Sequence, residues 1–99
     1  MAKLKPLHPG EVLREEFMEP YHLTPYALAH LCHIPRTRIE RIAREESGIT
    51  ADTALRLAKV FGTTPDFWLT LLSRYEVERT EAEIAKELMR IKPPEPVAA

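Results

Sequence analysis

Prolines and threonines divide this sequence into short helical segments. Pro9, Pro25 and Pro65 stand where the first turn of a helix accepts proline, and the last two each follow a threonine that can cap the helix. Pro20 ends the first segment, and Gly62 stands where a helix closes in the left-handed conformation. These signals predict five helices with very short connections, over residues 8–20, 23–32, 35–44, 48–62 and 63–75.

Apolar residues recur at helical spacing in these segments, and no alternation typical of β-strands appears. The predicted fold class is therefore all-α. The residues expected to face a common core are Val12, Leu13 and Phe17, then Leu28, Ala29 and Leu31, then Ile39, Ile42 and Ala43, and finally Leu55, Ala58 and Phe61.

The fifth predicted helix carries more apolar surface than a small core requires. Its stripe consists of Phe67, Trp68, Leu71, Leu72 and Tyr75. We expect part of this stripe to lie in the core and the remainder to form a symmetric contact between two copies of the chain.

A second helix start follows this stripe. Thr80, with Glu83 three residues later, has the pattern of a capping box. The apolar residues that would enlarge the dimer surface or contact another protein are Val77, Ile84, Leu88 and Ile91. We therefore expect a domain over residues 1–76, a helical extension over residues 77–91 and a disordered tail over residues 92–99.

Bulk properties exclude several classes of protein. No apolar run reaches the roughly 18 residues that span a bilayer, and the first ten residues lack the apolar core of a secretion signal. Cys32 is the only cysteine, which fits a reducing compartment, and we expect a cytoplasmic protein with no membrane partner. The formal net charge of −1 and a pI near 6.4 exclude a uniformly basic nucleic-acid binder, so any such function must be local.

The stretch PRTRIERIAR, residues 35–44, concentrates positive charge on one side of a helix. On a wheel of about 100° per residue, its apolar residues share one arc, which leaves the opposite side and both flanks polar. The outward residues are Arg36, Thr37, Arg38, Arg41 and Arg44, with Glu40 beside Arg36 on one flank.

The segment before this stretch is predicted to be a second helix, at a spacing typical of a DNA-binding motif. A helix over residues 23–32, a turn of two or three residues and a helix over residues 35–44 match a helix-turn-helix, whose second helix enters the DNA major groove. Arginine bonds bidentately to guanine and pairs with phosphate oxygens. This spacing favours DNA binding over the alternative that the arginines form only a solvated face.

Three stretches carry a resemblance to a known family: HPGEVLREEFMEP, LTPYALAHL and GITADTALRLAKVFGTTPDFWLTLLSRY. They resemble the HigA (also called VapI) branch of the Xre, lambda-repressor-like helix-turn-helix family, over about residues 7–76. The resemblance implies a five-helix lambda-repressor-like domain, here followed by the helical extension.

The resemblance also implies a function. HigA proteins are dimeric antitoxins that bind a HigB toxin, a RelE-like ribonuclease, and repress their own operon through a palindromic operator read in the major groove. By position, Thr24 and Tyr26 correspond to phosphate contacts, and Thr37, Arg38 and Arg41 to base contacts. The predicted DNA-binding set is completed by Arg36 and Arg44. We also expect no cofactor, and association with the nucleoid when the operator is bound.

The sequence departs from the family pattern within the DNA-binding half. Pro25 replaces the usual glutamine, His33 the turn glycine, and Pro35 the serine cap of the recognition helix. Glu45 and Glu46 stand where basic and polar residues usually precede the GIT motif. Two alternatives therefore stay open: a stand-alone regulator without a toxin, and a protein-interaction module whose DNA-binding face has decayed.

Metal binding and catalysis find little support in the sequence. His30 and Cys32 lie two residues apart on a helix and project about 160° from each other, and His33 adds no second close pair. No nucleophile has a partner base, and the three glycines form no phosphate-binding loop. We therefore expect neither a metal site nor an enzyme.

Overall fold

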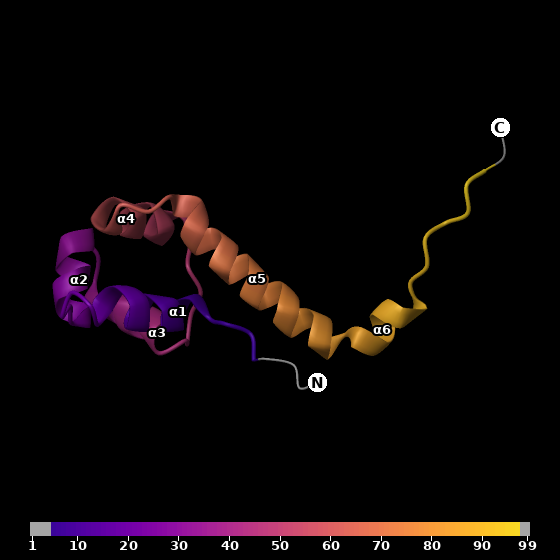
Figure 1. The fold of residues 1–99 in the computed structure, drawn as a ribbon, viewed down its shortest axis with the longest axis horizontal. Helices are drawn as coiled ribbons and strands as arrows, with labels where there is room; N and C mark the ends of the chain where they lie inside the picture. The colour runs from indigo at the N-terminus through magenta and orange to yellow at the C-terminus, as the bar shows by residue number, and fades with distance from the viewer. Residues whose placement is uncertain (1–4, 98–99) are drawn as a thin grey trace.

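The computed structural model of the chain describes residues 5–97, and every regular element in this range is helical (Figure 1). The elements are α1 (Pro9–Val12), η1 (Leu13–Met18), α2 (Pro25–Cys32), α3 (Arg36–Ala43), α4 (Ala51–Phe61), α5 (Pro65–Glu83) and α6 (Ala85–Arg90). The predicted all-α class is confirmed. The parts of the predicted domain and tail that fall on residues 1–4 and 98–99 lie outside the described residues.

The first predicted helix consists of two kinds of helical turn. Four α-helical residues in α1 lead directly into the six π-helical residues of η1, in which hydrogen bonds span five residues instead of four. The backbone N–H of Glu19 donates to the carbonyl of Arg14 at 3.0 Å in this pattern. The element ends at Met18, two residues before Pro20, as the predicted stop signal requires.

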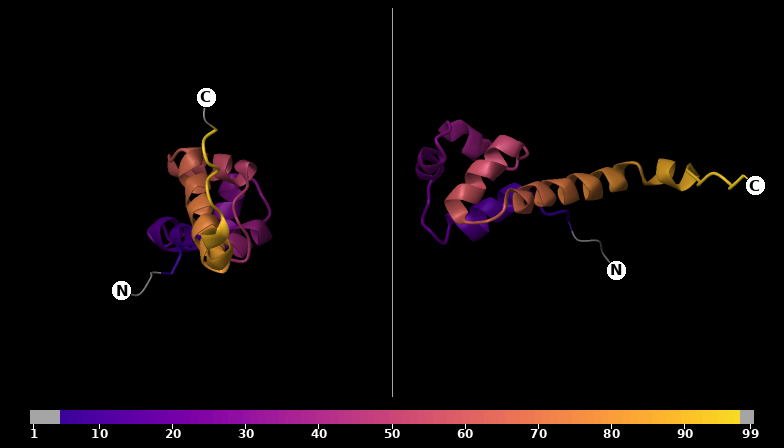
Figure 2. Two further views of the ribbon diagram at one scale, coloured as in Figure 1. Left: turned by 90° about the vertical axis from the view of Figure 1, so that its right-hand side faces the viewer. Right: turned by 90° about the horizontal axis from the view of Figure 1, so that it is seen from above.

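Helices α1 to α4 and the first turns of α5 gather at one end of the molecule, and the rest of α5 projects from them toward α6 (Figure 1). Seen from above, α5 and α6 form an extended arm (Figure 2). The described part of the chain measures 60 × 35 × 21 Å. Residues 91–97 form neither helix nor strand.

Local start and stop signals fix most of the helix ends. Thr24, Thr50 and Thr64 each accept a hydrogen bond on Oγ1 from the backbone N–H three residues later, at 3.1 to 3.2 Å. Gly62 closes α4 in the left-handed region, at φ 73°. The predicted threonine caps of α2 and α5 and the predicted end of α4 at Gly62 are therefore confirmed.

The predicted helix start at Thr80 is wrong. Helix α5 runs through this residue, whose carbonyl accepts a hydrogen bond from the backbone N–H of Ile84 at 2.9 Å. A capping box begins a helix only where the backbone leaves helical geometry before the cap, and α5 has no such break there. The helix also crosses residues 76 and 77, where the domain was predicted to end.

The core lies between α1, η1 and the four following helices. Its fully buried side chains include Leu13, Leu28, Ile39, Ile42, Leu57 and Trp68. Two predicted core residues are wrong: Leu31 is 50% exposed and Leu55 is 59% exposed. At about 100° per residue, Leu55 projects about 160° from the buried Leu57 of the same helix, and Leu31 about 100° from the buried Cys32, so each lies outside the buried side of its helix.

Gly10 permits close contact between α1 and α3. A Cβ at this position would overlap the backbone carbonyl oxygen of Ile42. The backbone N–H of Gly10 also donates to His8 Nδ1 at 2.8 Å, so a buried histidine caps α1. The sequence did not reveal this cap, because histidine is not among the usual capping residues.

Replacing Gly10 with alanine should destabilise the fold by about 1–3 kcal/mol, because the added methyl group meets rigid backbone and pushes α1 away from α3. Urea denaturation with an unchanged m-value measures this loss. Gly48→Ala is the control, since its Cβ would meet only the end of the Leu72 side chain, which can rotate away. Equal stability of the Gly10→Ala variant and the unmodified protein would refute the close contact.

Candidate nucleic-acid interface

Helix α3 presents the predicted arginine face to solvent. Ile39, Ile42 and Ala43 are buried against the core, as the helical wheel predicted. The exposed residues on the other sides of this helix and at its end are Arg36, Thr37, Arg38, Arg41 and Arg44. The sequence pattern therefore correctly separated the core-facing side of α3 from its charged sides.

Helices α2 and α3 pack against each other and are joined by residues 33–35, which gives the predicted helix-turn-helix. Thr24 is the N-cap of α2 and Tyr26 lies in its first turn, apart in sequence from the arginines of α3. The hydroxyl of Thr24 caps the helix, and Tyr26 is 67% exposed. The Tyr26 side chain is therefore accessible to solvent.

The unusual residues of the turn reproduce an ordinary helix end. His33 adopts the left-handed conformation that glycine favours, at φ 58°. The backbone N–H of Ile34 then donates to the carbonyl of Ala29 at 3.0 Å, which closes α2. Pro25 occupies the first helical position, where its missing N–H is not needed. These two departures from the family pattern leave the helix ends unaltered.

The four arginines of this face have different partners. Arg36 Nε lies 2.7 Å from Glu40 Oε1, and Arg44 Nη2 lies 3.9 Å from Glu40 Oε2. Arg38 Nη1 donates to Asp52 Oδ1 at 2.8 Å. Within residues 5–97 the side chain of Arg41 has neither a hydrogen bond nor an ion pair. Arg41 therefore carries the charge on this face that is unpaired among the described residues.

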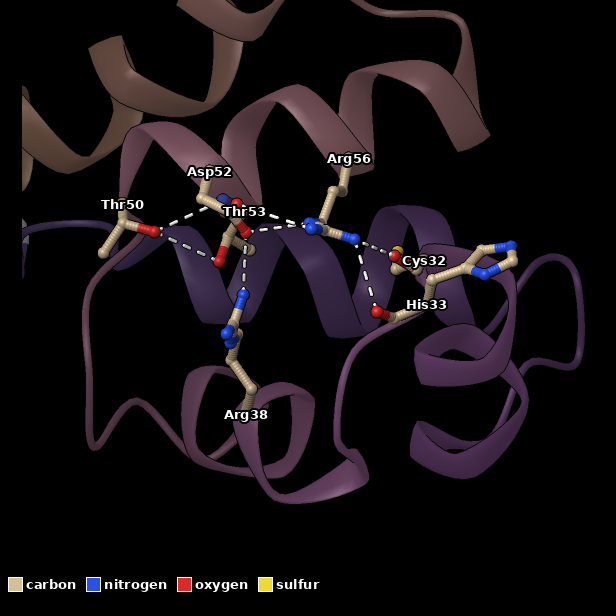
Figure 3. A network of polar contacts seen from close by, with 7 residues as sticks. All are labelled: Cys32, His33, Arg38, Thr50, Asp52, Thr53 and Arg56. Atoms are coloured by element: carbon tan, nitrogen blue, oxygen red, sulfur yellow. Dashed lines mark hydrogen bonds and ion pairs between the residues drawn. The ribbon is translucent and has the colours of Figure 1, made fainter.

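Asp52 joins α3 to α4 (Figure 3). Its Oδ1 also accepts a hydrogen bond from Arg56 Nε at 2.8 Å, and Arg56 Nη1 donates to the carbonyls of Cys32 at 2.8 Å and His33 at 3.3 Å. The hydrogen bond from Arg56 lowers the pKa of Asp52, and the bond from Arg38 lowers it further. The carboxylate is thus held in its charged form between two arginines.

Asp52 and Arg56 are not among the site residues predicted from the sequence. A signal was present, since an aspartate four residues before an arginine forms an ion pair along a helix. The bond from Asp52 to α3 has no such local signal, because Arg38 is fourteen residues away in sequence.

Glu45 and Glu46, the two acidic residues after α3, lie near other helices. Arg14 of η1 donates to the carbonyl of Ala43 at 2.5 Å and lies 3.5 Å from Glu45. Glu45 and Glu46 line a cleft together with Tyr75 of α5 and other residues of that helix. The charge of Glu45 is therefore partly offset by Arg14.

No cluster of three or more histidine, cysteine, aspartate or glutamate side chains suited to a metal ion occurs within residues 5–97. Cys32 is buried, and this burial raises the pKa of its thiol. None of the described helices has the length and apolar character needed to cross a membrane.

Comparison with known proteins places this geometry in context. A protein-family model described as helix-turn-helix matches residues 15–68. Virulence-associated protein I of Dichelobacter nodosus is 46% identical over 78% of this chain and 71% of its own length. Antitoxin HigA-1 of Vibrio cholerae is 32% identical over 93% of this chain and 87% of its own.

A solved structure extends the likeness to the fold. The Pseudomonas aeruginosa antitoxin HigA, determined with the higBA promoter, superposes with a TM-score of 0.84 and 37% identity. The match covers 90% of this chain and 97% of that protein. The similarity therefore includes the projecting end of α5 as well as the helix-turn-helix.

Proposed function

The chain belongs to the helix-turn-helix family, with HigA antitoxins among its relatives, and on that premise we propose that it is an antitoxin that represses its own operon. In this role it binds operator DNA through α3 and neutralises a HigB or RelE-like toxin. The observation that supports DNA binding most directly is the exposed arginine face of α3, backed by a buried apolar side and preceded by α2.

The residues of this face take different roles in the proposal. Thr37, Arg38 and Arg41 read base edges in the major groove. Thr24 and Tyr26, at the start of α2, contact the phosphate backbone. Arg36 and Arg44 share Glu40, so their net charge toward DNA is smaller, and we place them at the flanks of the phosphate contacts.

Operator binding can be measured by mobility shift with the DNA upstream of the gene. If Arg36 and Arg44 of each of two subunits contact phosphates, the slope of log K against log salt should be about −4. An unrelated duplex of the same length should bind more weakly by at least about a thousandfold. Equal affinity for both duplexes would contradict sequence-specific repression.

Toxin neutralisation needs a separate experiment. The reading frame beside this gene is expressed alone and together with this chain, and growth and co-purification are recorded. The antitoxin role requires that the adjacent product arrests growth, that co-expression restores it, and that the two proteins copurify. DNA binding without any of these results would instead favour a stand-alone regulator.

A two-fold dimer is part of this proposal, because palindromic operators are read by symmetric pairs of recognition helices. The wide stripe at the start of α5 is largely used within the chain, since Trp68 is buried and Leu71 packs against the core. Unused apolar side chains lie farther along the arm. They are Val77, Ile84, Leu88, Met89 and Ile91, all exposed. We place the dimer contact on this part of α5 and α6.

Replacing Val77 and Leu88 together with glutamate should convert the dimer into monomers, because two charges would be buried without partners. Light scattering after size exclusion measures the mass, and operator affinity should fall at least tenfold. Lys86→Glu is the control, since it alters the charge of the same arm at a polar position. If the double variant kept the mass of a dimer, the dimer contact would have to lie outside this part of α5 and α6.

A further inference from the structure

We propose that Asp52 positions the guanidinium of Arg38, so that α4 helps to determine which DNA sequence α3 reads. This inference rests on the proposed operator binding and adds a specificity-determining residue outside the helix-turn-helix. Asp52 is a positioning residue here, because it acts through Arg38 and not through its own contact with DNA.

The hydrogen bonds around Asp52 link α3, α4 and the end of α2. Arg38 extends from the first turn of α3 to the carboxylate in the first turn of α4 (Figure 3). The same oxygen, Asp52 Oδ1, is held by Arg56, whose Nη1 is fixed by the carbonyls at the end of α2. The acceptor for Arg38 is therefore itself anchored to the helix that precedes the turn.

Anchoring matters because an arginine can bind DNA in two ways. A mobile guanidinium pairs with any phosphate it reaches, which strengthens binding to every sequence. An oriented guanidinium can place two N–H groups against guanine O6 and N7, and this contact depends on the base. Asp52 reduces the first mode by neutralising Arg38, and it favours the second by limiting the side-chain conformations of Arg38.

Arg41 offers an internal contrast. It lies on the same exposed side of α3, and within the described residues it has no partner that would orient it. In this proposal Arg41 attracts DNA of any sequence and also contacts a base, whereas Arg38 discriminates between sequences. The ratio of operator affinity to affinity for unrelated DNA should therefore be sensitive to Asp52.

The test is Asp52→Asn, which keeps the size and one acceptor oxygen but removes the charge. Affinity for unrelated DNA should rise about threefold and operator affinity should fall about threefold, so the ratio should fall about tenfold. The salt slope for unrelated DNA should steepen by about 0.9 per subunit, as a freed Arg38 pairs with phosphate. If Asp52 had only a structural role, Asp52→Asn would lower the affinities for operator and unrelated DNA together and leave the salt slope unchanged.

A double-mutant cycle makes the result independent of any loss of stability. In the Arg38→Ala background, Asp52→Asn should leave the affinity ratio unchanged, because the group it positions is gone. An equal loss of the ratio in both backgrounds would overturn the proposal. Asp52→Glu should restore part of the ratio, since the carboxylate returns on a longer side chain.

Glu40→Gln is the matched control, because Glu40 pairs with Arg36 and Arg44 on the same helix. This change should strengthen binding to both DNAs by similar factors. A fall in the ratio as large as that of Asp52→Asn would show a general charge effect and refute the positioning role. The unmodified protein must prefer its operator in the same assay; if it does not, the proposed repressor function fails first.

Discussion

Replacing Arg38 and Arg41 together with alanine should abolish operator binding while the protein stays folded. Each base-reading arginine is worth about 1–3 kcal/mol, and a symmetric dimer loses each of them twice. Both side chains are exposed, and the bond lost within residues 5–97, from Arg38 to Asp52, is a surface ion pair that contributes little to stability. Binding should therefore fall far more than stability does.

Mobility shift and circular dichroism on the same preparations separate the two effects. Arg79→Ala combined with Arg90→Ala is the control, because it removes the same number of charges from the arm instead of from α3. This control should bind the operator almost as well as the unmodified protein. An operator shift that persists in the Arg38 and Arg41 variant would refute α3 as the recognition helix.

Replacing Trp68 with alanine should cost about 3–5 kcal/mol of folding stability, a large part of what a domain of this size possesses. The side chain is fully buried, and its Nε1–H donates to Thr63 Oγ1 at 2.9 Å. Its ring centroid lies 4.9 Å from that of Phe17 and 5.0 Å from that of Phe67. Alanine leaves a cavity that these rings fill only partly, and it also leaves the Thr63 hydroxyl without its donor.

Urea denaturation of two further variants tests this account. Phe67→Ala should cost less, because this neighbouring ring is already 37% exposed and its loss opens no closed cavity. The loss of folding stability in Trp68→Phe should lie between those in Phe67→Ala and Trp68→Ala, since phenylalanine keeps an aromatic ring but loses the hydrogen bond. A cost for Trp68→Ala no greater than that for Phe67→Ala would show that the tryptophan is not the centre of the core.

The charged and apolar sides of α3 could be predicted from the sequence because a regular helix fixes the direction of each side chain. Knowing that Ile39 and Ile42 recur at helical spacing is enough to place Arg41 on the solvent side. The threonine caps are predictable for the same reason, since each hydrogen bond closes within three residues. The roles of these side chains on DNA stay predictions until the variants above are measured.

The sequence alone therefore determined the all-α class, the helix-turn-helix and the arginine face, because helix ends and helix sides depend on near neighbours in the chain. The tertiary structure decided which arginines are already paired, since the bond from Arg38 to Asp52 joins two different helices. It likewise decided that Gly10 lies against the backbone of Ile42. Both contacts join residues far apart in the chain, and such contacts leave no periodic trace in the sequence.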